Sequence, residues 1–391
     1  MKILYYAPNP YLSLNAQTGY GTHMREMIRS WKEMGHEVET LIAGDLGNSA
    51  KSDTHQSQSS LKKAVKSFIP RFLWESLKDR QLMQFDMRMT EILNRRVLEF
   101  EPDLIYERVS YLQKSGVEIA GQRKIKHVAE VNAPFPEERI YFSGRSAYLN
   151  RARLVEKKII ENSYSLSVVS SALKSYIKKI QPSAADKVHV IPNAVNEQQI
   201  KLDTEKVGKL VSKYNPNNEL VLGFVGSIFP YHGVDLLLQA FNKTRGNSIL
   251  LIVGDGASLS KLKEYVAENN LSKRVYFTGS VPHKDVFHYI QLMDICCMMS
   301  SNWYGSPVKI FEYGLMKKAV IAPDTVPVRD VMTQGKDGLL VKNSLDSVEQ
   351  NLNRLISSRE LRNRLATSWN QKVLRNYTWK AAAQKTLNAC T

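Results

Sequence analysis

Short apolar runs alternate with longer amphipathic stretches along the whole chain. A short apolar run bounded by turn residues predicts a buried strand, and apolar residues at every third or fourth position predict a helix. In the first half this pattern predicts strands at Lys2–Ala7, Glu37–Ala43, Asp103–Glu107, His127–Val131, Leu166–Ser170 and Val188–Pro192. The first predicted helix has its apolar residues at Met24, Met27, Ile28, Trp31 and Met34.

A second alternating series follows a polar stretch around Lys209–Asn218, which we interpret as a linker. Its predicted strands are Leu220–Val225, Ile249–Val253, Val275–Thr278, Asp294–Met299, Ala319–Ala322 and Gly338–Val341. Its predicted helices are Val234–Phe241, Leu259–Asn269, Lys284–Leu292 and most of the chain after Leu345.

Repeated strand–helix units predict parallel sheets with helices on both faces, the α/β class. Two successive series predict two doubly wound, Rossmann-like domains, which we place at residues 1–205 and 206–372. Ligands bind such sheets at the carboxyl ends of the strands. We therefore expect the site in a cleft between the two domains.

Composition narrows the class of protein. The 391 residues are 43% hydrophobic and 24% charged, which is typical of globular proteins and excludes a disordered or fibrous chain. No apolar run approaches the roughly 20 residues of a membrane span, and the apolar start is too short for a signal peptide. The three cysteines form neither a disulfide framework nor a metal-binding spacing. These features predict a soluble, cytoplasmic protein.

The charge balance points to anionic partners. The chain has 54 Lys and Arg against 38 Asp and Glu, a net charge of +16. The segment Leu61–Arg80 combines basic residues with aromatic and aliphatic ones, a composition that can lie on an anionic membrane. The alternative is a helix packed on its own domain with a solvated basic face.

Two glycine-containing turns occupy equivalent places in the two halves. Gly19-Tyr20-Gly21-Thr22 opens the first helix, whose free N–H groups suit a phosphate, although a simple turn would look the same. The segment Gly226–Gly233 follows the first strand of the second half and contains Ser227 and His232. A protonated His232 could meet an anion there, but a lone histidine is more often structural.

The block Tyr304–Gly314 carries the most chemistry. Tyr304 and Gly305 follow a predicted strand, and Ser306 with Pro307 predicts the start of a helix. Lys309 and Glu312 share one face of that helix. A cation there could bind a diphosphate, and the carboxylate could accept hydrogen bonds from two ribose hydroxyls. The alternative is a surface ion pair of little energetic value.

In this order and spacing, these motifs resemble the retaining glycosyltransferases of the GT-B fold, family 4. The resemblance runs nearly end to end. It also includes Tyr106-Glu107-Arg108, Glu130-Val131-Asn132-Ala133-Pro134, Ile191-Pro192-Asn193-Ala194-Val195, Val253-Gly254-Asp255-Gly256 and Gly279-Ser280-Val281-Pro282-His283. Tyr377-Thr378-Trp379 resembles the start of the family's C-terminal segment, so residues 373–391 are expected to cross back onto the first domain.

The resemblance implies roles for individual residues. Glu312 matches the second acidic residue of the family's E-x7-E motif, which holds the nucleotide ribose. Lys309 would face the donor diphosphate, Gly21 would donate its amide to the distal phosphate, and Val281 and Pro282 would contact the base. Glu130 and Asn132 would meet the donor sugar or the acceptor. Lys309, Glu130, Asn132 and Gly21 are therefore the candidate catalytic residues, and Ser227, His232, Tyr304, Gly305 and Ser306 complete the candidate donor site.

In this family the departing phosphate helps to deprotonate the acceptor hydroxyl on the same face of the sugar. No enzyme nucleophile is needed, and the sequence offers no convincing one. It also lacks an Asp-x-Asp motif, so we expect neither a metal nor another cofactor.

Two departures from the family pattern bear on the donor site. The first acidic residue of E-x7-E is Tyr304 here, and the common Arg and Lys of the second glycine loop are Ser227 and His232. Two positive charges are thus missing where a diphosphate binds. A bound phosphate attracts compensating charge at close range, and we infer that Lys309 supplies it.

The resemblance implies sugar transfer from a nucleotide-diphosphate donor, most often a uridine nucleotide, to a glycan or lipid-linked acceptor. It suggests bacterial surface polysaccharide or glycolipid synthesis, peripheral to the inner face of the membrane. Alternatives are a nucleotide-sugar epimerase of the same fold and a degenerate, non-catalytic binder, which the loss of the acidic residue at Tyr304 allows. Nucleic-acid binding ranks last, because no recognition motif accompanies the basic residues.

Overall fold

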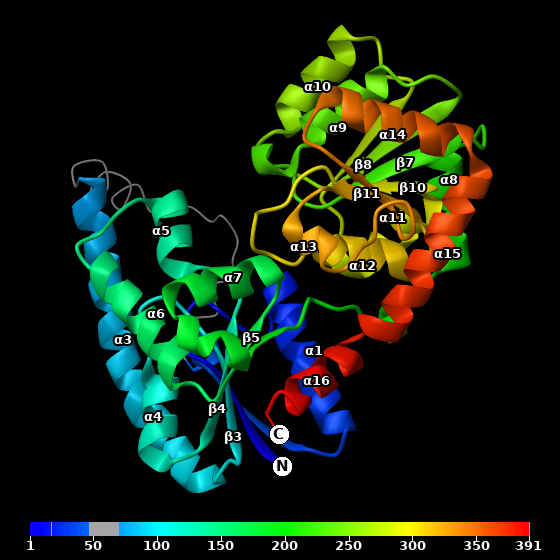
Figure 1. The fold of residues 1–391 in the computed structure, drawn as a ribbon. Helices are drawn as coiled ribbons and strands as arrows, with labels where there is room; N and C mark the ends of the chain where they lie inside the picture. Colours follow the sequence, from blue (N-terminus) through cyan, green and yellow to red (C-terminus); the bar gives the residue numbers. More distant parts are fainter. Residues whose placement is uncertain (17, 47–69, 391) are drawn as a thin grey trace. The chain divides into compact units, whose positions relative to one another are not determined.

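The computed structural model describes residues 1–16, 18–46 and 70–390. Residues 61–69 of the predicted membrane segment lie outside this range, whereas 70–80 lie within it. The chain divides into two compact units, Met1–Pro192 with Ala382–Thr391, and Asn193–Ala381 (Figure 1). Each unit contains a six-stranded parallel sheet with helices on both faces, which confirms the predicted fold class.

The first unit is built around the sheet order β2-β1-β3-β4-β5-β6. Its strands are β1 Lys2–Ala7, β2 Glu37–Ile42, β3 Leu104–Arg108, β4 Lys126–Val131, β5 Ser165–Val168 and β6 Val188–Val190. Its helices are α1 Gly19–Glu33, α3 Arg71–Phe100, α4 Ser115–Arg123, α5 Phe135–Ser143, α6 Leu149–Asn162 and α7 Ser171–Ile180. All six strands lie where the apolar runs predict them.

Opposite faces of this sheet bury different side chains. Leu4 and Ile105 pack with Met89 and Leu93 of α3 on one face. On the other face, the Trp31 ring of α1 lies edge-on to Tyr106, with ring centroids 4.8 Å apart. The Trp31 indole N–H donates to the Ala383 carbonyl at 3.2 Å. The final helix, α16 Trp379–Asn388, therefore has its last residues in the first unit.

The second unit has the sheet order β12-β11-β10-β7-β8-β9. Its strands are β7 Leu220–Val225, β8 Ser248–Val253, β9 Val275–Gly279, β10 Ile295–Cys297, β11 Ala319–Pro323 and β12 Leu339–Val341. Its helices are α8 Thr204–Tyr214, α9 Val234–Asn242, α10 Leu259–Glu268, α11 Val286–Leu292, α12 Val308–Leu315, α13 Val326–Arg329, α14 Leu345–Ser357 and α15 Arg359–Asn376. The predicted strands and the helical C-terminal stretch are confirmed.

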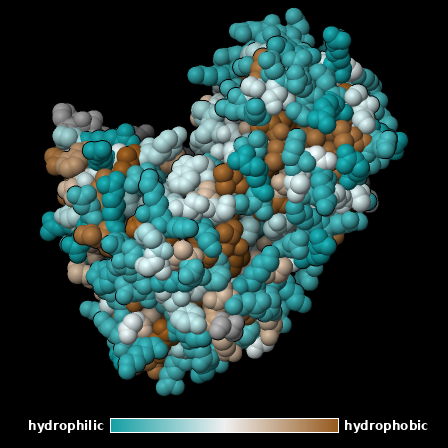
Figure 2. Space-filling view, viewed as in Figure 1, coloured by the Kyte–Doolittle hydropathy of each residue, from teal (hydrophilic) through white to brown (hydrophobic). Residues whose placement is uncertain are grey.

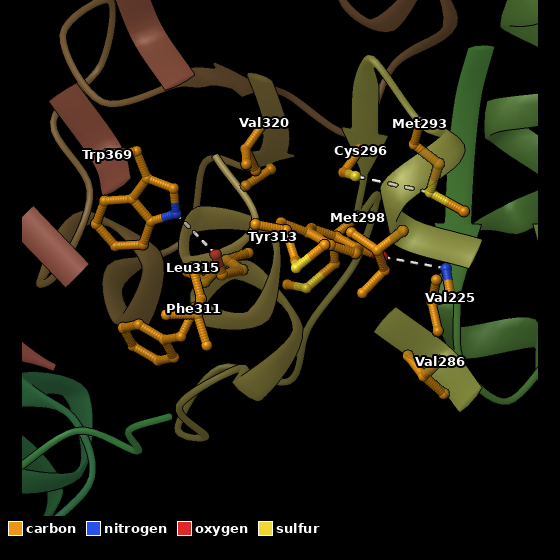
Figure 3. Packing of buried hydrophobic residues seen from close by; sticks show 14 of the residues in the cluster. Val225, Val286, Met293, Cys296, Met298, Phe311, Tyr313, Leu315, Val320 and Trp369 are labelled. Atoms are coloured by element: carbon orange, nitrogen blue, oxygen red, sulfur yellow. Dashed lines mark hydrogen bonds between the residues drawn. The ribbon is translucent and has the colours of Figure 1, made fainter. Parts of the chain in front are cut away.

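Buried hydrogen bonds fix α12 beneath this sheet. The Val225 amide of β7 donates to the Tyr313 hydroxyl at 3.0 Å. The Trp369 indole of α15 donates to the Ile310 carbonyl at 2.7 Å (Figure 3). A buried donor without a partner would cost about 1–3 kcal/mol, so these two bonds hold α12 in a single position. The Phe311 ring of the same helix packs on the Trp369 ring, with centroids 5.9 Å apart.

The prediction of a linker around Lys209–Asn218 is wrong. Most of this stretch belongs to α8, because Asp203 caps the helix start and Leu210 and Tyr214 are buried one turn apart. Residues 193–205 also pack in the second unit: the Val195 amide donates to the Tyr377 carbonyl at 2.9 Å. The two units therefore divide after Pro192, whereas the predicted domain boundary was after position 205.

Candidate functional site at the carboxyl ends of the strands

The second sheet has its topological switch point between β10 and β7. These strands are neighbours in the sheet although far apart in the chain, and the chain turns in opposite directions from them. The glycine loop follows β7, and the loop after β10 leads into α12. Crevices at such switch points are where open α/β sheets bind ligands. The sheet order thus brings together the two segments that the sequence singles out.

Lys309 lies directly against the glycine loop. A Cβ added to Gly226, whose φ is +137°, would sit 2.6 Å from the Lys309 Nζ. The same Nζ lies 4.4 Å from the centroid of the Phe224 ring, a favourable cation–π distance. Burial lowers the pKa of Lys309 to about 8, although nearby Glu312 opposes the shift. Gly226 is therefore required at this position to admit the partly buried Lys309 side chain beside the loop.

Glu312 joins Lys309 to a third loop. Burial raises the pKa of Glu312 to about 7, and the positive charge of Lys309 opposes this rise. The His283 Nε2, in the turn after β9, lies 3.8 Å from the Glu312 Oε1. Val281 is partly buried and Pro282 exposed just before this turn. The loops after β7, β9 and β10 therefore converge around the Lys309–Glu312 pair.

His232 does not replace the missing cations. Burial, followed by repulsion from Lys309, lowers its pKa to about 4, so its imidazole is neutral at pH 7. Ser227 is exposed and uncharged. Of Ser227, His232 and Lys309, only Lys309 therefore carries a charge at pH 7.

Ser306 precedes α12 but does not cap it, contrary to the prediction. The helix starts at Val308, as predicted to within a residue, but the cap position is Pro307 and no side chain caps it. Instead, the Ser306 Oγ accepts from the Asn193 amide at 3.0 Å, and the Ser306 carbonyl accepts from the Asn193 Nδ2 at 2.8 Å. The Ile191–Val195 motif thus anchors the loop before α12.

Tyr304 is largely buried in that loop. Its ring lies edge-on to Trp303, with centroids 5.2 Å apart. The Gly305 amide donates to the Asn302 side-chain oxygen at 2.5 Å. A bulky aromatic ring thus fills the position at which the family carries an acidic residue.

In the first unit, Glu130 is the centre of a buried polar cluster. It lies at the carboxyl end of β4 and accepts from the Arg108 guanidinium and, at 2.7 Å, from the Asn132 Nδ2. The His23 Nε2 is 3.1 Å from the same carboxylate, and the Tyr5 hydroxyl donates at 3.4 Å. Despite its burial, the Arg108 guanidinium and the adjacent His23 and Asn132 side chains hold the pKa of Glu130 well below its usual range. Glu130 is thus an ionised carboxylate engaged from several sides, and Asn132 is the more exposed of the two predicted residues.

Gly21 opens α1 next to a tightly held loop. Its amide donates to the Thr18 Oγ1 at 3.4 Å, a weak capping bond. A Cβ at Gly21 would meet the Ala16 carbonyl oxygen at 2.3 Å. The Arg25 guanidinium binds that carbonyl at 2.8 Å. Close packing of the loop is therefore sufficient reason for glycine at this position.

Three members of the polar cluster around Glu130 were not predicted from the sequence: Tyr5, Arg108 and His23. Arg108 belongs to the Tyr106-Glu107-Arg108 motif, but we predicted no role for it, and we predicted none for His23. His23 comes two residues after Gly21, so the reasoning applied to His232 beside the second glycine loop could have found it. Its partner on β4 is 107 residues away in the chain (130 − 23), and no local pattern reveals that contact.

Across the described ranges, no three His, Cys, Asp or Glu side chains are grouped to hold a metal ion. The expectation that no metal or cofactor is required remains a prediction. Within the same ranges, no helix is long and apolar enough to cross a bilayer.

Two family models match the chain, one in each half. "Glycosyltransferase Family 4" matches residues 18–199, and "Glycosyl transferases group 1" matches residues 209–371. An uncharacterized glycosyltransferase of Methanocaldococcus jannaschii is 24% identical over 68% of this chain and 67% of its own length. The lipopolysaccharide 1,2-N-acetylglucosaminetransferase of Salmonella typhimurium is 25% identical over 59% of this chain and 62% of its own length.

The chain spans 67% of the length of the Methanocaldococcus jannaschii relative and 46% of the length of two other curated relatives. Among solved structures, Anabaena HepE in complex with UDP superposes with a TM-score of 0.73 at 16% identity, covering 99% of both chains. At this identity the likeness establishes the fold.

Proposed function

We propose that this chain moves a sugar from a uridine-diphosphate donor to a glycan or lipid-linked acceptor. The premise is that it is a glycosyltransferase of the GT-B fold, with a family 4-like first domain and a group 1 second domain. Transfer proceeds with retention of anomeric configuration. The acceptor belongs to surface polysaccharide or glycolipid synthesis, on the cytoplasmic side of a membrane. The lipopolysaccharide transferase among the relatives and the UDP bound to HepE support this choice of substrates.

The observation that carries the proposal is the partly buried Lys309 beside Gly226. An ammonium group in a partly dehydrated site, with its pKa lowered to about 8, lacks a full complement of solvent and counter-charge. A diphosphate bound over the glycine loop supplies that counter-charge. As the bond to the sugar breaks, negative charge grows on the same phosphate, so a fixed cation there stabilises the transition state more than the ground state.

Glu312 is the candidate for binding the ribose of the donor nucleotide. Its carboxyl lies on the same helical face as Lys309, one turn farther along, and a carboxylate can accept bonds from two adjacent hydroxyls. Val281 and Pro282, next to His283, provide an apolar edge for the base.

Product analysis tests the proposal against its alternatives. The protein is incubated with UDP-glucose, UDP-galactose and UDP-N-acetylglucosamine, with and without an extract of bacterial glycolipids, and nucleotides are separated by chromatography. A transferase releases UDP in proportion to glycosylated acceptor. An epimerase instead converts one UDP-sugar into another without releasing UDP. A donor that binds but stays unchanged under all conditions would favour the non-catalytic alternative and contradict the proposal.

A further inference from the structure

We propose that Glu156 of α6 is a positioning residue for the reaction: its buried carboxyl holds the turn that carries Asn132 at the carboxyl edge of the first sheet. The inference rests on the proposed function in one respect, since Asn132 is expected to meet the donor sugar or the acceptor. Glu156 acts through its neighbours and does not itself contact the substrate.

Three helices meet at Glu156. The residue is 8% exposed, and its Oε2 accepts from the Tyr176 hydroxyl of α7 at 2.9 Å. Among the described residues, none makes a full hydrogen bond to the buried Oε1. The Phe135 amide, at the first position of α5, nevertheless lies close enough to favour the charged form of the carboxyl. The carboxyl of Glu156 therefore connects α6 to both α5 and α7.

An apolar pocket beside this carboxyl brackets the turn. Its lining includes Val109 after β3, Val131 at the end of β4 and Phe135 of α5. Asn132 lies between Val131 and Phe135 in the chain, so both ends of its turn are held against the same pocket. The pocket has a volume of about 10 Å³, room for about one water molecule, which is too small for a sugar or a nucleotide. Glu156 therefore acts on the protein around it rather than on a ligand.

The start of α5 depends on this carboxylate because no side chain at its cap position serves it. That position is Pro134, which makes no side-chain capping bond. The first N–H groups of a helix carry partial positive charge, and a nearby carboxylate stabilises them. Pro134 lies two residues after Asn132 (134 − 132), so a shift of the first turn of α5 moves Asn132 as well. The ionised carboxyl therefore holds the turn, and the protonated carboxyl releases it.

The position of Glu156 on α6 is not that of an ordinary surface acid. Figure 2 shows mostly hydrophilic atoms over the outer face of α6, where Arg153, Lys157 and Glu161 are exposed. Glu156 lies on the buried face of the helix, as does Ile159. A buried carboxylate without a full set of partners is costly, so such a group tends to take up a proton. The helix thus places a titratable group where its charge matters.

Glu156 titrates near neutral pH. Burial raises its pKa to about 7, and the negative charge of Glu137 on α5 adds to the rise. The Tyr176 hydroxyl, the Phe135 amide and Arg153 oppose it. Glu137 and Arg153 pair with each other at 2.9 Å, so their opposite charges partly cancel at the carboxyl. The held and released states of the turn are therefore both populated around pH 7.

Two further titratable side chains lie on the elements around Glu156. Tyr111, after β3, lines the same pocket, but burial raises its pKa and its hydroxyl donates to Asp79 at 3.1 Å, so it is uncharged at pH 7. Glu138 follows Glu137 in the first turn of α5 and is half-buried. Its negative charge acts on Glu156 in the same direction as that of Glu137. Neither side chain supplies a positive charge to an ionised Glu156.

The pH profile of acceptor turnover tests the proposal. Turnover of the full chain at saturating UDP-sugar, with the bacterial glycolipid extract as acceptor, is measured between about pH 5.5 and 7.5, below the pKa of Lys309. The variants are Glu156→Gln, Tyr176→Phe and Glu137→Gln. The matched control is Glu161→Gln, because Glu161 is an exposed acidic residue of the same helix.

We expect the turnover of the wild type and of Glu161→Gln to rise about five-fold through a midpoint near pH 7, because the ionised carboxylate holds the turn with a charge-assisted bond. Glu156→Gln should keep the lower turnover at every pH. Tyr176→Phe removes a donor that favours the charged form, so its midpoint should move to higher pH. Glu137→Gln removes a negative charge, so its midpoint should move to lower pH. A rise that survives in Glu156→Gln, or midpoints that do not move in these directions, would overturn the proposal.

The melting temperature tests the buried titration without any substrate. The pKa of Glu156 is raised from 4.5 to about 7, so its stabilising contribution is present below pH 4.5 and is lost as the pH rises through about 7. The wild type should therefore lose melting temperature relative to Glu156→Gln between about pH 5 and 7.5. A difference that stays constant over this range would contradict the inference.

The same experiments separate this inference from the proposed function. The Kd of UDP should be equal in the wild type and Glu156→Gln, because the candidate nucleotide site belongs to the second unit. Absence of turnover by the wild type at every pH would refute the proposed function and this inference with it. Normal turnover with the same pH profile in Glu156→Gln would refute only the role of Glu156.

Discussion

Replacing Lys309 with alanine is expected to lower kcat by about 10²–10³-fold, the usual cost of removing one group that stabilises charge developing in a transition state. The expectation is this large because Lys309 stands alone: Ser227 is neutral, and the pKa of His232 is lowered to about 4. No second cation in the glycine loop can compensate. Steady-state release of UDP from the donor measures the effect.

The comparison with His232→Ala makes this prediction specific. A neutral imidazole contributes at most a hydrogen bond, so His232→Ala should cost about ten-fold or less. If His232→Ala were as damaging as Lys309→Ala, or more so, Lys309 would not be the source of the missing charge.

The pH dependence adds an independent test. Since the pKa of Lys309 is lowered to about 8 in the free protein, its positive charge is present below pH 8 and is lost as the pH rises. UDP affinity should therefore fall above pH 8, by up to about ten-fold per pH unit for one proton lost. In Lys309→Arg the guanidinium stays charged, so the decline should disappear. A decline that persists in Lys309→Arg would assign it to another group.

Replacing Glu130 with alanine is expected to destabilise the first unit by about 3–5 kcal/mol, because it leaves the buried Arg108 charge uncompensated. For a unit of this size the melting temperature should fall by about 10 °C. The pKa of Glu130 lies below its ordinary value of 4.5, so its contribution is present at neutral pH and is lost on acidification. The difference between wild type and variant should therefore shrink as the pH falls below about 4.

Asn132→Ala is the control for this prediction. Asn132 donates one bond to Glu130 and is partly exposed, so its loss should cost only about 1 kcal/mol. If Glu130→Ala were as stable as wild type but inactive, Glu130 would contact substrate rather than organise Arg108 and His23.

The apolar pattern was sufficient to predict the fold. Fully buried parallel strands such as Ile249–Val253 are nearly continuous apolar runs, and glycine and proline residues separate them from the helices. The sequence pattern did not predict α8 because most of its surface is polar and only Leu210 and Tyr214 are buried. A short amphipathic helix with a charged outer face looks like a linker when its buried residues are few.

The candidate donor site was partly predictable because its members are close together in the sequence. Lys309 and Glu312 lie in one helix, and helical spacing alone puts them on one face. The hydrogen bond between Asn193 and Ser306 and the contact between His23 and Glu130 join distant segments. Such contacts follow from strand order and packing, which no local pattern specifies.

The most direct test of the central claim, a nucleotide site around Lys309 and Glu312, is a thermal-shift panel. The melting temperatures of wild type and Glu312→Ala are measured with UDP, GDP, ADP and CMP. A ligand at a hundred times its Kd stabilises the folded state by about 2.7 kcal/mol, a shift of several degrees at about 2–4 °C per kcal/mol. We expect UDP to raise the melting temperature of the wild type by this amount and that of Glu312→Ala by much less. Equal shifts in both proteins, or no shift with any nucleotide, would contradict the claim.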